Sequence, residues 1–392
     1  MFAVLAGPSV WAVQACDIDG QHVNPNNGHT TQGKTGLMRC RDGEGGPLVR
    51  EQELKDGVFM GVVRYWKDGQ LEREHRVNAR GNRDGLSREY ALVAGAAKSV
   101  LVREETLRDG RTVGLARSWH PNGALRRVSF HGDDEREQAS AEFTAQGQLS
   151  ELSCAPRPVL APDFDDAKAC GHGGSVSAVS LYGGKGQVRA RLAYERGERR
   201  RSEQLWESGS VRELQEIGAS GGVERSFAAD GTKRREVVWV VQERPAGERP
   251  RRIVTLEQQH HESGKLVQEK RWRPVERGSE LVSEQTWYLN GQPKQLVEFA
   301  TGEGKTLRRD TTFHDNGRKA SEGVWTVAVA GRRSGELATG VHRSWDADGR
   351  LRSERSHDEK GRIARERELD GNGTVVRDDE VFEDGSRKAV GR

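Results

Sequence analysis

The sequence predicts an all-β protein: an elongated, meandering antiparallel sheet or solenoid built from β-hairpin repeats. Three observations predict it, namely a motif that recurs along the chain, Asp-Gly and Asn-Gly pairs between alternating segments, and a composition poor in apolar residues. Of the 392 residues, 33% are hydrophobic, 31% are charged and 48 are glycine. A compact body of this length needs more apolar residues to fill its core, whereas an extended array keeps much of its surface in water. The composition therefore favours an array.

The recurring motif consists of Gly, then Val or Leu, an Arg three residues after the Gly and an aromatic residue five after it. It starts at Gly61, Gly85, Gly114, Gly222 and Gly340. Looser copies keep only the spacing of four residues from an aromatic residue to a turn glycine. The predicted repeat aromatics are Tyr65, Trp66, Tyr90, Trp119, Phe227, Trp287, Phe313 and Trp345, and the predicted turn glycines are Gly69, Gly123, Gly147, Gly231, Gly291, Gly317 and Gly349.

Each unit is predicted to be a β-hairpin. Asp-Gly and Asn-Gly supply the positive φ that tight hairpin turns require, and in VVRYW (62–66) apolar and charged residues alternate. Pairing two such strands is expected to bury a stripe of aromatic residues and to leave a stripe of Arg and Glu in water. A single hairpin is only marginally stable, so neighbouring hairpins must stack to complete the burial. A one-dimensional array follows.

At the N-terminus an apolar run precedes Val13-Gln14-Ala15, which has the small-x-small form of a signal-peptidase site. We therefore expect residues 1–15 to be the remnant of a signal peptide. No Lys or Arg precedes Lys34, so the basic start of a signal is missing, and the alternative is a first buried strand. The run is too short to cross a bilayer. A further alternative is a lipid on Cys16, as in an outer-membrane lipoprotein, although Gln14 fits such a cleavage site poorly.

Four cysteines fall into two local pairs, Cys16 with Cys40 and Cys154 with Cys170. An even count and short loops predict two disulfides in an oxidising compartment, because a zinc site would want a C-x-x-C pair and none is present. The expected organisation is a disulfide-closed segment (16–50), a first repeat lobe (51–153), a proline-rich disulfide loop or joint (154–172) and a second repeat lobe (173–392). Two apolar runs, 235–243 and 324–330, are expected to be strands buried on both faces.

Charge and motifs exclude several classes of function. The 63 Lys and Arg are balanced by 60 Asp and Glu, a net charge of +3, and both signs alternate along the chain. A nucleic-acid binder normally has a one-sided basic face, so we expect no nucleic-acid partner. The run ATGEGKTL (300–307) lacks the first glycine of a phosphate-binding loop, and no nucleophile elbow or H-E-x-x-H spacing occurs. We expect no catalytic, cofactor-binding or metal-binding residues.

The stretch from Gly57 to Leu71 follows the pattern G-x-x-x-G-x-x-x-x-aromatic-x-x-[DN]-G-x-[LV]. This pattern resembles the variant MORN repeat of bacterial proteins described as YwqK-type antitoxins. The resemblance covers roughly residues 51–152 and 173–390 and is closest over 56–90. The segment 345–366 also resembles the YD repeats of Rhs shells, although it lacks their regular tyrosines. For function, the resemblance implies immunity to a type VI phospholipase or another envelope-acting effector.

The leading hypothesis is a periplasmic immunity protein that binds a cognate secreted toxin and occludes its active site. Arg, Trp and Tyr dominate the binding energy of protein interfaces, and a repeat sheet offers a broad face on which to display them. The alternative is a non-catalytic structural scaffold of the bacterial envelope. A third hypothesis, a hydrolase or lyase acting on polysaccharide, requires a paired acid and base in a cleft. We expect a monomer when free, and membrane association only if Cys16 is lipidated.

Overall fold

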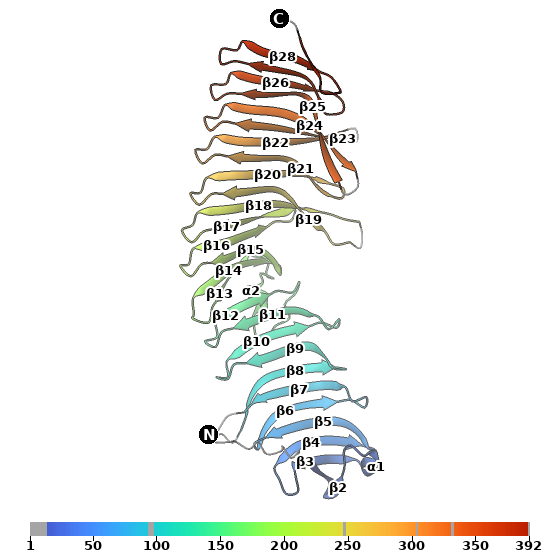
Figure 1. Cartoon of the computed structure of the whole chain (residues 1–392). Helices are drawn as coiled ribbons and strands as arrows, with labels where there is room; N and C mark the ends of the chain where they lie inside the picture. Colours follow the sequence, from blue (N-terminus) through green and yellow to red (C-terminus); the bar gives the residue numbers. More distant parts are fainter. Residues whose placement is uncertain (1–13, 93–97, 246–247, 303–304, 331–332, 391–392) are drawn as a thin grey trace, which may run out of the picture. The chain divides into compact units, whose positions relative to one another are not determined.

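The structure is a computed structural model that describes residues 14–92, 98–245, 248–302, 305–330 and 333–390 (Figure 1). The fold is nearly all β, with 63% strand and 2% helix. Its strands form two antiparallel sheets of 12 and 17 strands. The predicted all-β meander is therefore confirmed. The predicted signal peptide falls almost entirely on residues 1–13, which lie outside the described residues.

The first sheet follows chain order except at its start, where β1 lies between β3 and β2. Its strands are β1 (Gln14–Ile18), β2 (Gln21–Val23), β3 (Gly36–Asp42), β4 (Leu48–Lys55), β5 (Val58–Lys67), β6 (Gln70–Val77), β7 (Arg83–Ala91), β8 (Val100–Arg108), β9 (Arg111–Trp119), β10 (Leu125–His131), β11 (Glu137–Phe143) and β12 (Leu149–Ser153). A short helix, α1 (Gly28–Thr31), lies between β2 and β3 in the sequence.

The second sheet follows chain order throughout. Its strands are β13 (Ser177–Tyr182), β14 (Val188–Glu195), β15 (Glu198–Leu205), β16 (Val211–Ile217), β17 (Gly221–Phe227), β18 (Lys233–Gln242), β19 (Arg251–His260), β20 (Leu266–Val275), β21 (Gly278–Trp287), β22 (Pro293–Gly302), β23 (Lys305–Phe313), β24 (Lys319–Ala330), β25 (Arg333–Trp345), β26 (Leu351–His357), β27 (Ile363–Leu369), β28 (Val375–Val381) and β29 (Arg387–Ala389). The helix α2 (Asp166–Ala169) lies in the connection from β12 to β13.

The chain divides into two compact units, residues 1–199 and 200–392. The change from the first sheet to the second falls between β12 and β13, whereas the boundary between the units falls at residues 199 and 200. The hairpin β13–β14 belongs to the first unit because its side chains bond to the last strand of the first sheet. The Tyr194 hydroxyl donates to Leu152 O at 3.0 Å, and Arg189 Nη2 donates to Ser150 O at 2.6 Å.

Two kinds of hairpin turn recur among the described residues, and both need a residue with positive φ. That residue is usually glycine, although Glu135 takes the position in the β10–β11 turn, with φ 63°. At the β5–β6 turn both residues have positive φ, 51° at Asp68 and 76° at Gly69, which is the two-residue turn favoured by strand twist. At the β9–β10 turn, Gly123 N donates to His120 O and His120 N donates to Ala124 O, so only the glycine is left-handed. This is a three-residue loop with a bulge. All seven predicted turn glycines have φ between 76° and 89°.

Successive turns along one sheet edge are joined by side chains. His120 Nε2 lies 2.9 Å from Phe143 O, and Asn122 donates to Ala145 O at 2.9 Å in the next turn. The second unit repeats this arrangement, since the Tyr288 hydroxyl donates to Phe313 O at 2.9 Å. The residue that follows the repeat aromatic therefore tends to carry a polar ring that bonds to the next repeat.

The core of the first unit lies in local clusters. Cys16 and Cys40 are directly opposite in register on β1 and β3, form a disulfide and are buried together with Met38. A second cluster lies where β10 and β11 meet the connection from β12 to β13, and contains Val128 and Leu160, both with 0% exposure. Buried side chains are thus gathered at the disulfides, where non-repeat segments cover the sheet.

Two expectations about burial are wrong. The strand at 235–243 is buried on one face only: Val237 and Trp239 are 3% and 7% exposed, whereas Val238 and Val240 are half-buried. The described residues 324–327 are likewise half-buried. The reason is that β18 contacts mainly its two neighbouring strands, β17 and β19, and no other element packs against its second face to a similar extent. The expected stripe of Arg and Glu keeps contact with water, since the side chains of Arg64 and Arg88 are 34% and 36% exposed, but its members also pair with one another.

Candidate binding surface of the first unit

A row of alternating charges crosses the first sheet from β3 to β9. Strand by strand it consists of Arg39, Glu51, Arg64, Glu74, Arg88, Glu104 and Arg117, each directly opposite the next in register. We call this row the ladder. Directly opposed residues on one face of an antiparallel pair interact, so every interior member of the ladder lies between two opposite charges.

The ladder is held by ion pairs in which an arginine bonds to carboxylates on both flanking strands. Arg64 Nε lies 2.6 Å from Glu74 Oε2, and Arg88 Nε lies 2.9 Å from Glu104 Oε2. The hydrogen bond to Glu74 is the largest of the contributions that raise the pKa of Arg64, and the bond to Glu104 does the same for Arg88. The Glu74 and Glu104 side chains are only 21% and 20% exposed, so these pairs are shielded from water more than ordinary surface pairs.

The ladder ends at the disulfide loop, residues 154–170, which is closed by Cys154 and Cys170. Arg117 Nε lies 2.8 Å from Asp163 Oδ2 of this loop and Arg117 Nη1 lies 3.5 Å from Glu104 Oε1. The loop itself is fixed by the buried Asp166, whose Oδ2 accepts hydrogen bonds from the backbone N–H groups of residues 159 and 160 at 2.7 and 3.0 Å. The loop therefore supplies the last charge of the row.

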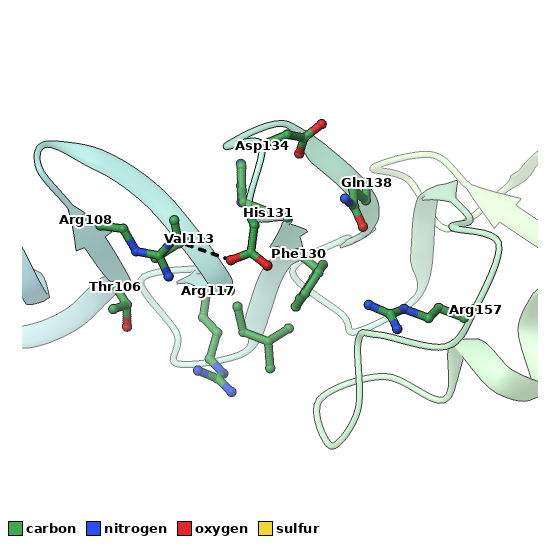
Figure 2. Close-up of a pocket in the computed structure, with 13 residues that line it drawn as sticks. Thr106, Arg108, Val113, Arg117, Phe130, His131, Asp134, Gln138 and Arg157 are labelled. Atoms are coloured by element: carbon green, nitrogen blue, oxygen red, sulfur yellow. Dashed lines mark hydrogen bonds and ion pairs between the residues drawn. The ribbon is translucent and has the colours of Figure 1, made fainter.

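Beside this end of the ladder lies an open hollow of about 800 Å³ between β8, β9, β10 and the start of the disulfide loop. Figure 2 shows Phe130 near its centre, with Arg108 and Arg157 approaching from two sides. Leu115 and Phe130 form an apolar floor that packs on the buried cluster around Val128. Its volume is in the range of ligand and hot-spot pockets, which combine apolar walls with a few polar groups.

The arginines on the rim of the hollow differ in how they are paired with carboxylates. Arg117 pairs with Glu104 of the ladder and with Asp163 of the disulfide loop. Arg108 Nη1 lies 3.4 Å from Asp133 Oδ1, whose side chain is 96% exposed. Arg157 is exposed and has no carboxylate within ion-pair distance in the part of the chain that is described. An apolar floor beside a spare guanidinium can receive an apolar side chain flanked by an acidic one.

The opposite face of the same strands holds a second hollow, of about 490 Å³. Its floor is made of small residues, Ala116 and Ser129, which are directly opposite in register on β9 and β10. Its wall is charged and only partly paired: Arg127 lies 2.5 Å from Glu137 and 2.9 Å from Glu142, while Arg126 and Glu89 also line it. This hollow has no large apolar side chain in its floor, so we regard the first hollow as the better candidate site.

The predicted repeat residues do not converge on one site. All eight repeat aromatics are half-buried and lie at strand ends beside the turns, and Trp119 alone among them lines one of the two hollows described above. Phe130, at the centre of the candidate site, was missed because it lies outside the aromatic position of the repeat. The signal that could have found Arg117 was present: it is the arginine three residues after Gly114.

Within the described residues, no group of three or more His, Cys, Asp or Glu could hold a metal ion. No described helix is long and apolar enough to span a membrane. Both predicted disulfides, Cys16–Cys40 and Cys154–Cys170, are present and indicate an oxidising compartment.

No protein-family model matches the chain, and no curated protein matches it. Among solved structures it is similar to the crystal structure of TcdB2-TccC3, with 10% identity and a TM-score of 0.17, over 90% of this chain and 24% of that one. It is also similar to the Photorhabdus luminescens Tc holotoxin pore, with 11% identity and a TM-score of 0.17, over 94% of this chain and 23% of that one. The chain spans about a quarter of these proteins. At such TM-scores the likeness supports no argument about fold or function.

Proposed function

We propose that this protein is a non-catalytic immunity protein of the periplasm that binds a secreted antibacterial toxin and covers its active site. The observation that carries the proposal is the hollow beside the disulfide loop, with an apolar floor at Leu115 and Phe130 and arginines on its rim. Such a surface matches the composition of protein-interface hot spots. The two disulfides support a location outside the reducing cytosol.

The resemblance of residues 51–152 and 173–390 to variant MORN repeats supports the toxin as the class of partner. We propose an envelope-acting enzyme, such as a type VI phospholipase effector. A loop of the toxin bearing an apolar residue next to an acidic one would fill the hollow and pair with Arg157. The broad sheet around it would then lie across the toxin's cleft and exclude substrate.

The test is recovery of the partner and measurement of its inhibition. The chain from Cys16 onward is used to capture proteins from the native periplasm, and any stoichiometric partner is assayed for lipid or cell-wall hydrolysis with and without the chain. The proposal expects one partner whose activity the chain abolishes at equimolar ratio. Absence of such a partner, or a bound enzyme that stays fully active, would contradict it.

A charge reversal locates the contact. Arg157→Glu is expected to weaken toxin binding at least tenfold, because it places a carboxylate against an acidic partner. Lys168→Glu is the matched control: it makes the same change of charge in the same loop, on an exposed residue that does not line the hollow. Equal binding by both variants would move the contact elsewhere on the protein.

The alternative is a structural scaffold of the bacterial envelope. It is favoured by the turn-to-turn hydrogen bonds, which stiffen one edge of each sheet irrespective of any partner. In that case the capture experiment recovers only abundant envelope proteins or lipid, and Arg157→Glu changes nothing in the set of proteins recovered.

A further inference from the structure

On the face of the first sheet opposite the ladder, several arginines have no acidic partner. The register places Arg50, Tyr65 and Arg73 directly opposite one another on β4, β5 and β6. Two residues further along β6, His75 lies opposite Ser87 of β7. Since side chains alternate between faces along a strand, these residues point away from Glu51, Arg64 and Glu74 of the ladder.

Tyr65 orders two of these arginines. The guanidinium carbons of Arg50 and Arg73 lie 5.7 and 4.4 Å from the centre of its ring, and the ring of His75 is stacked beside it at 6.0 Å. Stacking on an aromatic ring restricts the arginine side chain and leaves its N–H groups able to donate. One of them is already used, since Arg50 Nη2 donates to Gln52 Oε1 at 3.0 Å. The two guanidinium groups are therefore held in place before any ligand arrives.

These groups also have unused hydrogen-bonding capacity. The Nε atoms of Arg50 and Arg73 and Nδ1 of His75 are buried and have no hydrogen-bond partner. In the described part of the chain no carboxylate lies within ion-pair distance of Arg50, Arg73 or Arg83, whereas Arg64 on the opposite face bonds to two. Buried polar groups without partners are uncommon and call for a water or an ion.

Arg83 lies at the start of β7, opposite Val77, on the strand next to that of His75. His75 is 6% exposed. Its pKa is lowered to about 4, first by burial and then by the positive charges of Arg83, Arg73 and Arg50. At neutral pH the ring is therefore uncharged. The carboxylate in register on this face is Glu89 of β7, which lies opposite Arg73 without an ion pair between them, so three arginines face one glutamate.

We propose that Arg50, Arg73 and Arg83, grouped around His75, form a binding site for a phosphate group. Guanidinium forks match the oxygens of phosphate and carboxylate equally well. Three arginines facing the single Glu89 leave about two positive charges, which a phosphate offsets better than one further carboxylate does. The ligand is accordingly inorganic phosphate or the phosphate of a lipid headgroup. This site lies on the opposite face from the ladder and is independent of the proposed toxin contact.

The test is a titration of the full chain, labelled at histidine Cε1 with ¹³C, with inorganic phosphate at constant ionic strength. Bound phosphate offsets the field of the arginines, so the pKa of His75 is expected to rise upon saturation; His75→Gln assigns the resonance. Arg73→Gln is expected to weaken phosphate binding about tenfold or more, as loss of one charge-assisted hydrogen bond does. Arg76→Gln, an exposed arginine on the other face of β6, is the matched control.

Vesicles distinguish the two sources of phosphate. If the chain floats with phosphatidylglycerol vesicles but not with phosphatidylcholine vesicles, and Arg73→Gln no longer floats, the ligand is a lipid headgroup. If the chain binds inorganic phosphate but does not float, the ligand is the free ion. If Arg73→Gln fails to fold by circular dichroism, Arg83→Gln at the start of β7 replaces it. An unchanged His75 resonance up to tens of millimolar phosphate, together with no difference between the variants on vesicles, would overturn the proposal.

Discussion

The two units place the same repeat position in different electrostatic surroundings. In the first unit the ladder is charged at every strand from β3 to β9, whereas the equivalent row of the second unit is charged at its two ends and mostly neutral between them. From β17 to β28 that row reads Arg225, Glu236, Gln258, Glu269, Gln285, Leu296, Thr311, Glu322, Arg343, Glu354, Arg367 and Asp378.

The difference shows that an arginine in this row has carboxylates on the flanking strands, although the reverse does not hold, since Gln258 stands between Glu236 and Glu269. Arg343 bonds to Glu322 at 3.3 Å and to Glu354 at 2.9 Å. Where Gln285 and Thr311 stand in the arginine position, the residue between them is the neutral Leu296. A half-buried charge without a partner is costly, so an arginine is compatible with this position only when the flanking strands supply carboxylates.

The largest expected effect comes from the disulfide loop, which caps the ladder in the first unit. Changing Cys154 and Cys170 to serine removes a bridge across a sequence separation of 16 residues. A loop of that size corresponds to about 3 kcal/mol of stabilisation. Hydrogen exchange read strand by strand should speed up in β9 to β12 and stay unchanged beyond β17. Equal acceleration in both units would show that the loop is not a local cap.

A second effect is a difference in pH dependence between the units. The pKa of His75 is about 4 in the folded state, below the usual 6.5. Between these values only the unfolded chain is protonated, so stability falls as the pH drops from 6.5 to 4, by roughly 2–3 kcal/mol. Urea denaturation at pH 6.5 and at pH 4 measures the change in the free energy of unfolding, and hydrogen exchange in β4 to β7 shows where it occurs. His75→Gln should abolish the dependence; a variant as pH-sensitive as the parent would refute the assignment.

The surroundings of Glu322 in the second unit should respond only at lower pH, in contrast to those of His260 and His357, whose pKa values are lowered first by burial. The pKa of Glu322 is lowered, first by the hydrogen bond from Lys319 and also by Arg343. Its contribution is present above the unfolded pKa near 4.5 and is lost as the pH falls through the lower folded value. The rate of hydrogen exchange in β24 and β25 should therefore stay constant from pH 6.5 to 5, whereas exchange in β4 to β7 should already become faster. Loosening of β24 at Glu322 together with β4 to β7 in that range would contradict this difference.

A third, smaller effect comes from removing one ladder member. Arg88→Gln leaves Glu74 and Glu104 partly uncompensated, and we expect a loss of about 1–2 kcal/mol, between the values for exposed and buried pairs. The matched change in the second unit, Gln285→Leu, removes no charge and should cost under about 0.5 kcal/mol. Chemical denaturation of both variants provides the comparison. Equal losses would mean that the ladder contributes no more than ordinary surface pairs.

The smallest effect should come from extending the charged row of the second unit. The double variant Gln285→Arg with Leu296→Glu restores the alternation found in the first unit. We expect a gain of about 0.5 kcal/mol, the size of a cross-strand charge pair, with each single variant neutral or destabilising. The coupling energy of the double-mutant cycle is the measurement. A coupling near zero would show that register alone does not create the interaction.

Local sequence determined the strands, the turns and the pairing of cysteines. Asp68-Gly69 and its counterparts specify where the chain reverses, because few other residues adopt positive φ, and alternation specifies the strands between them. Cys154 and Cys170 are near enough in sequence for one short loop to join them. These features depend on neighbouring residues and could therefore be predicted without the fold.

Register and covering segments were decided only by the tertiary structure. Sequence periodicity shows that Arg64 and Arg88 share a face, but not that Glu74 stands between them across two strands. Likewise, nothing local indicates that Asp163 reaches Arg117, or that Phe130 becomes the floor of a hollow. Those contacts join residues from different strands and from the disulfide loop, and interactions across strands exist only once the register is set.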